Sequence, residues 1–235
     1  HTTWKDRYQR SNDADVANPG GYYDFAGITQ VHSGVEVDMN AKVGDKLKLN
    51  GMFSLGKWVY EGNITGRRFD VNNNNISGGT TTTYFVDGTR VGDVAQMTAS
   101  IGAAYELAPR FNVDANYRLS DKLFASLDPT KQLSATNKGT LELPSYGLVD
   151  AGISYRLLLG TDKSKSLNFR LNINNVLDEV YIAESRSNIF ATDFVSGTSG
   201  PTYNSAGRTY NGVADANQVF FGFGRTWNFT MRYNF

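Results

Sequence analysis

The last nine residues, Trp227 to Phe235, read WNFTMRYNF. Successive side chains of an extended strand point to opposite faces. One face of this segment therefore carries only apolar and aromatic side chains, namely Trp227, Phe229, Met231, Tyr233 and Phe235. The other face carries asparagine, threonine and arginine. A chain end is usually frayed, whereas here the alternation continues to the terminal residue, so the segment predicts a strand with one apolar and one polar face.

The same two-residue period recurs along the chain and is the main indication of its fold. Six further segments form three predicted hairpins, in each of which two alternating runs are joined by a short turn: 31–43 with 47–55, 97–107 with 111–119, and 149–156 with 167–173. Alternation of this kind specifies the register of strand pairing. An opening strand at 2–9 and the closing strand bring the predicted number to about eight.

Composition agrees with a single all-β domain. The chain has 235 residues, of which 13% are aromatic and 24 are glycine, with a net charge of zero and no cysteine. These values give no reason to expect a nucleic-acid partner, disulfides or thiolate metal sites. Mean hydropathy is −0.39, and no run approaches the roughly 20 apolar residues of a membrane helix. A transmembrane β-barrel has this composition, because half of its wall residues face water.

The connections between predicted strands alternate in length. Short turns are expected at 44–46, 108–110 and 160–166, and long polar loops at 10–28, 61–94, 121–145 and 183–221. Outer-membrane barrels have short periplasmic turns and long extracellular loops. The pattern predicts an antiparallel transmembrane β-barrel in the bacterial outer membrane, with lipid against its apolar faces and a periplasmic C-terminus. A soluble sandwich is disfavoured, because the predicted strands exceed the usual five or six residues.

Three segments resemble the C-terminal half of TonB-dependent outer-membrane transporters. They are TTWKDRYQ at 2–9 followed by SGVEVDMNAKVGDKLKLNG from Ser33, LNFRLNINNVLDEVYIAES at 167–185, and GRTWNFTMRYNF at 224–235. The resemblance implies that residues 1–235 are the C-terminal part of one barrel domain of about 22 strands, with its plug domain and TonB box outside this chain. His1 opens directly into a strand-like run, which also leads us to expect a mature or partial chain.

The resemblance further implies active uptake of a scarce nutrient, driven through the TonB complex. The substrate would be a ferric siderophore, cobalamin, an oligosaccharide or a peptide, in the last two cases with a surface lipoprotein partner as in Bacteroidota members of the family. The closing strand resembles the signal strand used in barrel assembly. No catalytic residue, cofactor or metal is expected.

Loops are the predicted ligand-binding surface, since barrels act through their rim and lumen. Three loop clusters combine aromatic and charged side chains and are predicted to contact the substrate: Tyr22, Tyr23, Asp24 and Phe25; Tyr84 and Phe85; Tyr203, Arg208 and Tyr210. The same side chains would also serve to pack loop against loop. Asn174, Asn175 and Asp178 are predicted to be structural, as partners for backbone groups that leave a strand.

Two other classes of function compete with transport. Eight strands also suffice to close a small barrel, which would act as a structural anchor or adhesin. An outer-membrane hydrolase could use His32 and Ser33, but neighbouring strand residues point to opposite faces. Asn12, Asp13 and Asp15 lack the glycine and distal glutamate of a calcium loop. The sequence therefore favours a transporter without covalent chemistry.

Overall fold

Eight long strands dominate the structure, a computed structural model that describes residues 1–161 and 163–235. In chain order they are β1 (Thr2–Asn12), β2 (Tyr22–Val43), β3 (Leu47–Glu61), β6 (Met97–Ala108), β7 (Phe111–Asp121), β10 (Tyr146–Leu159), β11 (Lys165–Asn174) and β16 (Thr226–Asn234). The predicted eight strands are confirmed. The predicted turn at 160–166 includes residue 162, which lies outside the described residues.

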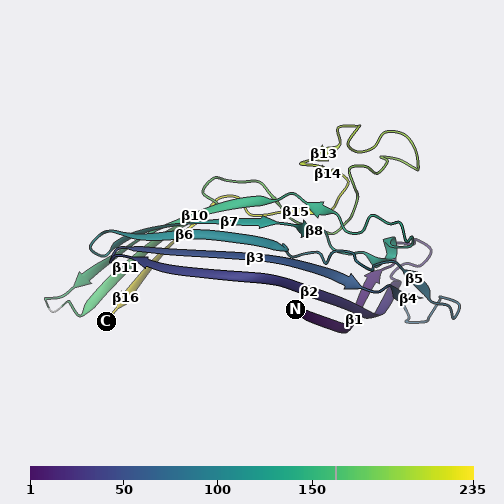
Figure 1. The fold of residues 1–235 in the computed structure, drawn as a ribbon, viewed down its shortest axis with the longest axis horizontal. Coiled ribbons are helices and arrows are strands. Elements are labelled where there is room, and N and C mark those ends of the chain that lie inside the picture. The colour runs from purple at the N-terminus through teal and green to yellow at the C-terminus, as the bar shows by residue number, and fades with distance from the viewer. Residues whose placement is uncertain (162) are drawn as a thin grey trace.

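These strands form one antiparallel, up-and-down sheet (Figure 1). Its order is β16-β11-β10-β7-β6-β3-β2, and β1 pairs with β2. The partners of β1 run only from Tyr22 to His32, so β1 lies toward the loop end of β2. In the described part of the chain, β16 pairs with β11 and not with β1. The sheet is therefore an open wall, and the closed eight-stranded barrel considered as an alternative is not formed.

The pairing register aligns apolar side chains in continuous rows across this wall. One row crosses seven strands through Val43, Leu47, Tyr105, Val113, Ile153, Leu171 and Phe229. Side chains on this face are exposed: the exposed fraction is 62% for Val35, 63% for Ile101 and 72% for Trp227. Soluble monomers rarely expose a contiguous apolar area of this size. The face is therefore suited to contact lipid.

The opposite face of the wall is polar, as the alternation predicts. Arg170 donates two hydrogen bonds to the carboxylate of Asp114, at 2.6 and 2.8 Å. Arg118 pairs with Asp150 at 2.7 Å. The two-bonded Arg170–Asp114 pair has a fixed geometry and joins β11 to β7 across β10. The Arg118–Asp150 pair joins the neighbouring strands β7 and β10 on the same polar side.

The predicted long loops contain short strands of their own, gathered at one end of the sheet (Figure 1). These elements are β4 (Ile64–Phe69), β5 (Thr82–Tyr84), β8 (Leu123–Phe124), the 3-10 helix η1 (Pro129–Lys131), β9 (Glu142–Leu143), β12 (Ile182–Ser185), β13 (Thr209–Tyr210), β14 (Val213–Ala214) and β15 (Val219–Phe221). The prediction of a loop at 10–28 is wrong in extent, because Tyr22 to Phe25 of β2 pair with both β1 and β4.

The buried core lies at this loop end. One cluster joins strand and loop residues: Phe25, Ile28, Tyr60, Ile64, Tyr84, Val86 and Leu127. A second joins the later loops: Leu123, Ala125, Leu141, Leu143, Ile182 and Val213. Ile28 and Tyr60 belong to the polar-face side of β2 and β3, so the loops fold over that side. Across the described residues, the structure has no helix with the length and apolar character required to cross a membrane.

The assignment of the two faces is testable with one substitution made on each side of β6. Ala103 pairs with Leu49 and Ala115 on the apolar face, and Ala104 pairs with Lys48 and Asp114 on the polar face. We expect Ala103→Arg to lower the free energy of unfolding by about 2–4 kcal/mol and Ala104→Arg to change it far less. Urea titration of the protein in lipid vesicles measures both, and equal losses would contradict the assignment.

Candidate ligand-binding site

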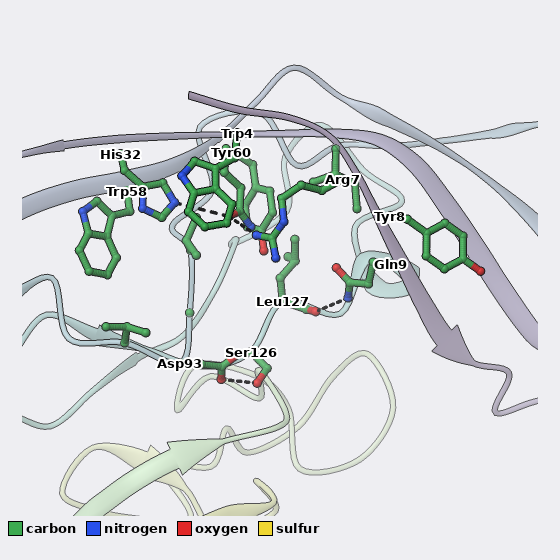
Figure 2. Close-up of a pocket in the computed structure, with 15 residues that line it drawn as sticks. Trp4, Arg7, Tyr8, Gln9, His32, Trp58, Tyr60, Asp93, Ser126 and Leu127 are labelled. Atoms are coloured by element: carbon green, nitrogen blue, oxygen red, sulfur yellow. Dashed lines mark hydrogen bonds between the residues drawn. The ribbon is translucent and has the colours of Figure 1, made fainter. Parts of the chain in front are cut away.

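A cavity of about 580 Å³ lies where β1, β2 and β3 meet the loops (Figure 2). Three rings stand in line along one wall: the Trp4 and His32 centroids are 6.1 Å apart, and those of His32 and Trp58 are 5.0 Å apart. Their planes are inclined by only 18° and 14°. The Arg7 guanidinium carbon lies 5.4 Å from the Trp4 ring centroid. The wall therefore presents aromatic rings beside a cation.

Trp58 is held firmly on β3, opposite His32 on β2. Its backbone nitrogen donates to Gln96 Oε1, and Gln96 Nε2 donates to its carbonyl, both at 3.0 Å. The indole lies over Gly56, where an added Cβ would come within 2.7 Å of the Trp58 Nε1 atom. A small residue at position 56 thus leaves the room that this ring needs.

An irregularity in β1 brings Trp4 and Arg7 to the same face. Residues three apart in a regular strand point to opposite faces, but the register shifts between Trp4 and Arg7, and Asp6 has a φ of 53°. Arg7 Nη1 donates to Gln30 Oε1. Within the described residues Arg7 forms no ion pair, so its charge is available to a ligand. A bulge with a left-handed residue redirects side chains in this way.

The loops form the other side of the cavity. In Figure 2, Asp93 and Ser126 lie on this side, and the Ser126 hydroxyl donates to the Asp93 carboxylate. Gln9 Nε2 donates to the Leu127 carbonyl at 3.3 Å, which joins β1 to this loop. The cavity combines aromatic rings, which can stack on a planar group, with one guanidinium outside any ion pair among the described residues, which can bind negatively charged oxygens.

The histidine and serine that the sequence offered as a catalytic pair do not contact each other among the described residues. His32 Nε2 lies 3.4 Å from Gln30 Oε1, while Ser33 Oγ is hydrogen-bonded at 2.7 Å to His1 Nδ1. His32 and Ser33 thus lie on opposite faces, as the sequence predicts. Among the described residues, no group of three or more histidine or acidic side chains is arranged to hold a metal ion.

Four of the nine predicted substrate contacts are buried. Phe25 is fully buried and meets the Tyr84 ring edge-to-face at 5.0 Å. Tyr22 stacks on Phe69 at 5.2 Å. Tyr203 is also buried. Tyr22 and Phe25 thus pack strand β2 against β4 and β5, a packing role like the one that the sequence left open for these side chains.

The remaining predicted contacts are more accessible but lie away from the aromatic cavity. Asp24 is paired with Arg10 at 2.9 Å, and Arg208 with Asp215 at 2.9 Å. Tyr23, Phe85 and Tyr210 complete the set. None of the nine residues lines the cavity of Figure 2, and their contact with a substrate stays a prediction.

Sequence reasoning missed Trp4, Arg7 and Trp58 as site residues. One available indication was that Trp58 and His32 fall on the polar face of their strands, where an aromatic ring is not needed for contact with lipid. For Trp4 and Arg7 there was no such indication, because alternation alone places them on opposite faces.

The structural interpretation of the Asn-Asn-x-x-Asp segment is confirmed for Asn175 and Asp178, whereas Asn174 donates to the Thr226 hydroxyl at 3.2 Å. Asn175 is buried, and its side chain both donates to the Glu179 carbonyl and accepts from the Glu179 nitrogen, at 2.9 Å each. Asp178 Oδ1 accepts from the Arg225 nitrogen at 2.7 Å. The segment therefore fastens the end of β11 to the approach of β16. The side chains of β16 named above all lie on the exposed apolar face, and their role in barrel assembly stays a prediction.

Known proteins share this architecture. The family described as TonB dependent receptor-like, beta-barrel, matches residues 1–176. The chain belongs to this family. The probable TonB-dependent siderophore receptor PiuA of Acinetobacter baumannii is 26% identical over 153 residues, which are 64% of this chain and 18% of that protein. The ferrioxamine receptor of Yersinia enterocolitica is 27% identical over 173 residues, 72% of this chain and 20% of that protein.

The chain thus spans about a fifth of the length of these curated relatives. Membership of a TonB-dependent receptor family implies an outer-membrane location. In that location the exposed apolar rows of this receptor barrel contact lipid, and the polar face with its ion pairs is turned away from lipid.

Loop 13–21 of the receptor is fastened to β4 by charge. Arg68 forms ion pairs with Asp13 at 2.5 Å and with Asp15 at 2.7 Å. Burial acts to raise the pKa of Asp13, but hydrogen bonds from Asn18 and Arg68 outweigh it and hold this pKa below its usual range. A lowered pKa in the folded state stabilises the loop at neutral pH, and this contribution is lost as the pH falls through the folded-state pKa.

We therefore expect backbone amides of loop 13–21 to be protected from hydrogen exchange at neutral pH. Protection should be lost as the pH falls below the range of a free aspartate, about 3.9. Asp13→Asn should remove it at neutral pH, whereas Asp45→Asn, in the fully exposed turn at the other end of the sheet, should leave it unchanged. Mass spectrometry of exchanged peptides gives the readout. If protection were unchanged both at low pH and in the Asp13→Asn variant, the proposed role of the Arg68–Asp13 ion pair would be refuted.

Proposed function

We propose that this chain forms part of the wall and part of the substrate site of a receptor that imports a ferric siderophore through the outer membrane, using energy delivered by TonB. The observation that carries the proposal is the unpaired guanidinium of Arg7 beside the stacked rings of Trp4, His32 and Trp58. Hydroxamate and catecholate groups are planar, so they can stack on aromatic rings, and their negatively charged oxygens can accept hydrogen bonds from a guanidinium.

The relatives add support for this substrate class. One is named a probable siderophore receptor and the other a ferrioxamine receptor. Cobalamin, oligosaccharides and peptides are competing substrates. A sugar would use the ring faces but has no negative charge for Arg7, so the dependence of uptake on that charge distinguishes it from an iron chelate.

The proposal also assigns an orientation. The long loops would be extracellular, and the short turns and C-terminus periplasmic, as in barrels of this type. The loops supply one side of the cavity through Asp93, Ser126 and Leu127, so a ligand arriving from outside would meet them first. TonB would act from the periplasmic side, and no covalent step by the receptor is required.

Iron uptake by a strain that lacks the receptor tests the proposal. We expect the complete receptor to restore uptake of a ferric hydroxamate or catecholate under iron limitation. Arg7→Gln should weaken binding about tenfold or more, because it removes a charged hydrogen bond to the ligand of about 1.5–3 kcal/mol. Trp58→Ala should weaken it about two- to twelvefold, because it removes a stacking contact of about 0.5–1.5 kcal/mol. Arg67→Gln is the matched control, because Arg67 is an exposed arginine of β4 outside the cavity.

Initial rates of radioactive iron uptake and the dissociation constant in detergent provide the readouts. Equal iron uptake with and without the receptor would overturn the siderophore assignment. If the strain that lacks the receptor instead grew poorly on cobalamin or a glycan, that compound would become the proposed substrate. If Arg7→Gln and Trp58→Ala both bound the siderophore as tightly as the unchanged receptor, the substrate site would have to lie elsewhere on the receptor.

A further inference from the structure

A second cavity, of about 550 Å³, lies between the loop at 125–141 and the segment 186–193. It is distinct from the aromatic cavity, although the two cavities are lined by adjacent residues of one loop. Ser126 and Leu127 line the first cavity, while Asp128, Lys131 and Gln132 line the second. A molecule held in the second cavity would therefore contact the loop that forms one side of the first.

Hydrogen bonds between the two loops build this cavity. Asn188 accepts from the Leu141 nitrogen and donates to the Ser126 carbonyl, both at 2.7 Å. Lys138 Nζ donates to Thr192 Oγ1 at 2.8 Å and pairs with Asp193 at 2.5 Å. The walls are thus connected at several points, which makes the space a formed site.

Gln132 brings an unsatisfied polar group to this site. The residue is only 3% exposed, and its Oε1 atom is buried without a hydrogen-bond partner among the described residues. Its backbone is already used, since the nitrogen donates to the Pro129 carbonyl at 2.9 Å and the carbonyl accepts from the Phe85 nitrogen at 2.7 Å. A buried acceptor without a partner is costly, so Oε1 calls for an O–H or N–H donor from an occupant.

The charges around the cavity favour an anion. Lys131 forms no ion pair in the described part of the chain, and Arg186 has a 3.5 Å contact with Glu184 and lies 4.9 Å from the centroid of the Phe220 ring. The two acidic groups of the cavity are already engaged: Asp193 by Lys138, and Asp128 by the nitrogen and hydroxyl of Thr130, at 3.1 and 2.7 Å. Phe190 and Ile189 add an apolar wall.

We propose that this cavity is a second ligand site, which binds a small organic anion with an apolar ring and a hydroxyl group. Lys131 and Arg186 attract the anionic group, Phe190 contacts the ring, and Gln132 Oε1 accepts a hydrogen bond from the hydroxyl. The site uses none of the residues assigned to the siderophore, so it goes beyond the transport function.

The probe that matches these features is 4-hydroxybenzoate, titrated into the complete receptor in detergent and followed by ligand-observed NMR. Benzoate lacks the donor, and 4-hydroxybenzyl alcohol lacks the charge. We expect 4-hydroxybenzoate to bind about fivefold more tightly than benzoate, and the alcohol to bind most weakly. Gln132→Leu should abolish the difference between the two acids. Lys131→Gln combined with Arg186→Gln should weaken both acids about tenfold, while Lys57→Gln, on the opposite side of the sheet, should change neither.

No binding of 4-hydroxybenzoate at about 10 mM, or binding that the cavity variants leave unchanged, would overturn the proposal. Loss of binding in Arg7→Gln would assign the probe to the first cavity and would also overturn it. Lys131 and Arg186 are exposed, so their variants test the site even if Gln132→Leu fails to fold. Iron uptake measured in the same variants reports on the transport function separately.

Discussion

The pairing register of the antiparallel sheet is the constraint on which this structure depends. Lipid offers no hydrogen bonds, so strands that contact it must pair all along their length, and a slip of one residue would exchange the two faces. The same register sets the ion pairs of the polar face. The Arg170 guanidinium crosses β10 to reach Asp114 over Gly152, where a Cβ would come within 2.3 Å of Arg170 Nη2.

The sequence predicts the features that depend on neighbouring residues and misses those that depend on contacts between distant segments of the chain. The eight strands and their faces are predictable because a two-residue period is a local property. The loop end is not, since contacts such as Phe25 with Tyr84 join segments far apart in the chain. Tyr22 to Phe25 were expected in a loop, but β2 continues through them past Gly27, whose φ of 72° accommodates the irregularity, and β4 supplies a second partner.

The candidate site was harder to predict than the wall for a related reason. Alternation assumes a regular strand, and the site depends on the place where β1 is irregular. The left-handed conformation of Asp6 lets Trp4 and Arg7 face the same cavity. Strict alternation along a regular strand would place these two residues on opposite faces. The position of Trp58 is predictable from the alternation, which places it on the polar face of β3, although aromatic residues near strand ends also suit a membrane interface. The decisive property was the face on which the ring lies.

The wall of long strands and the loop end of the molecule are stabilised in different ways. The long strands bury little of their apolar face, so their stability depends on lipid, whereas the loop end has a core of its own. Buried polar side chains hold that core in shape: Gln96 is bonded to both the nitrogen and the carbonyl of Trp58, and Asn188 joins two loops. Satisfied networks of this kind specify one arrangement of the backbone. The loop end, which holds the candidate site, can thus keep its geometry independently of the contacts between the wall and the membrane.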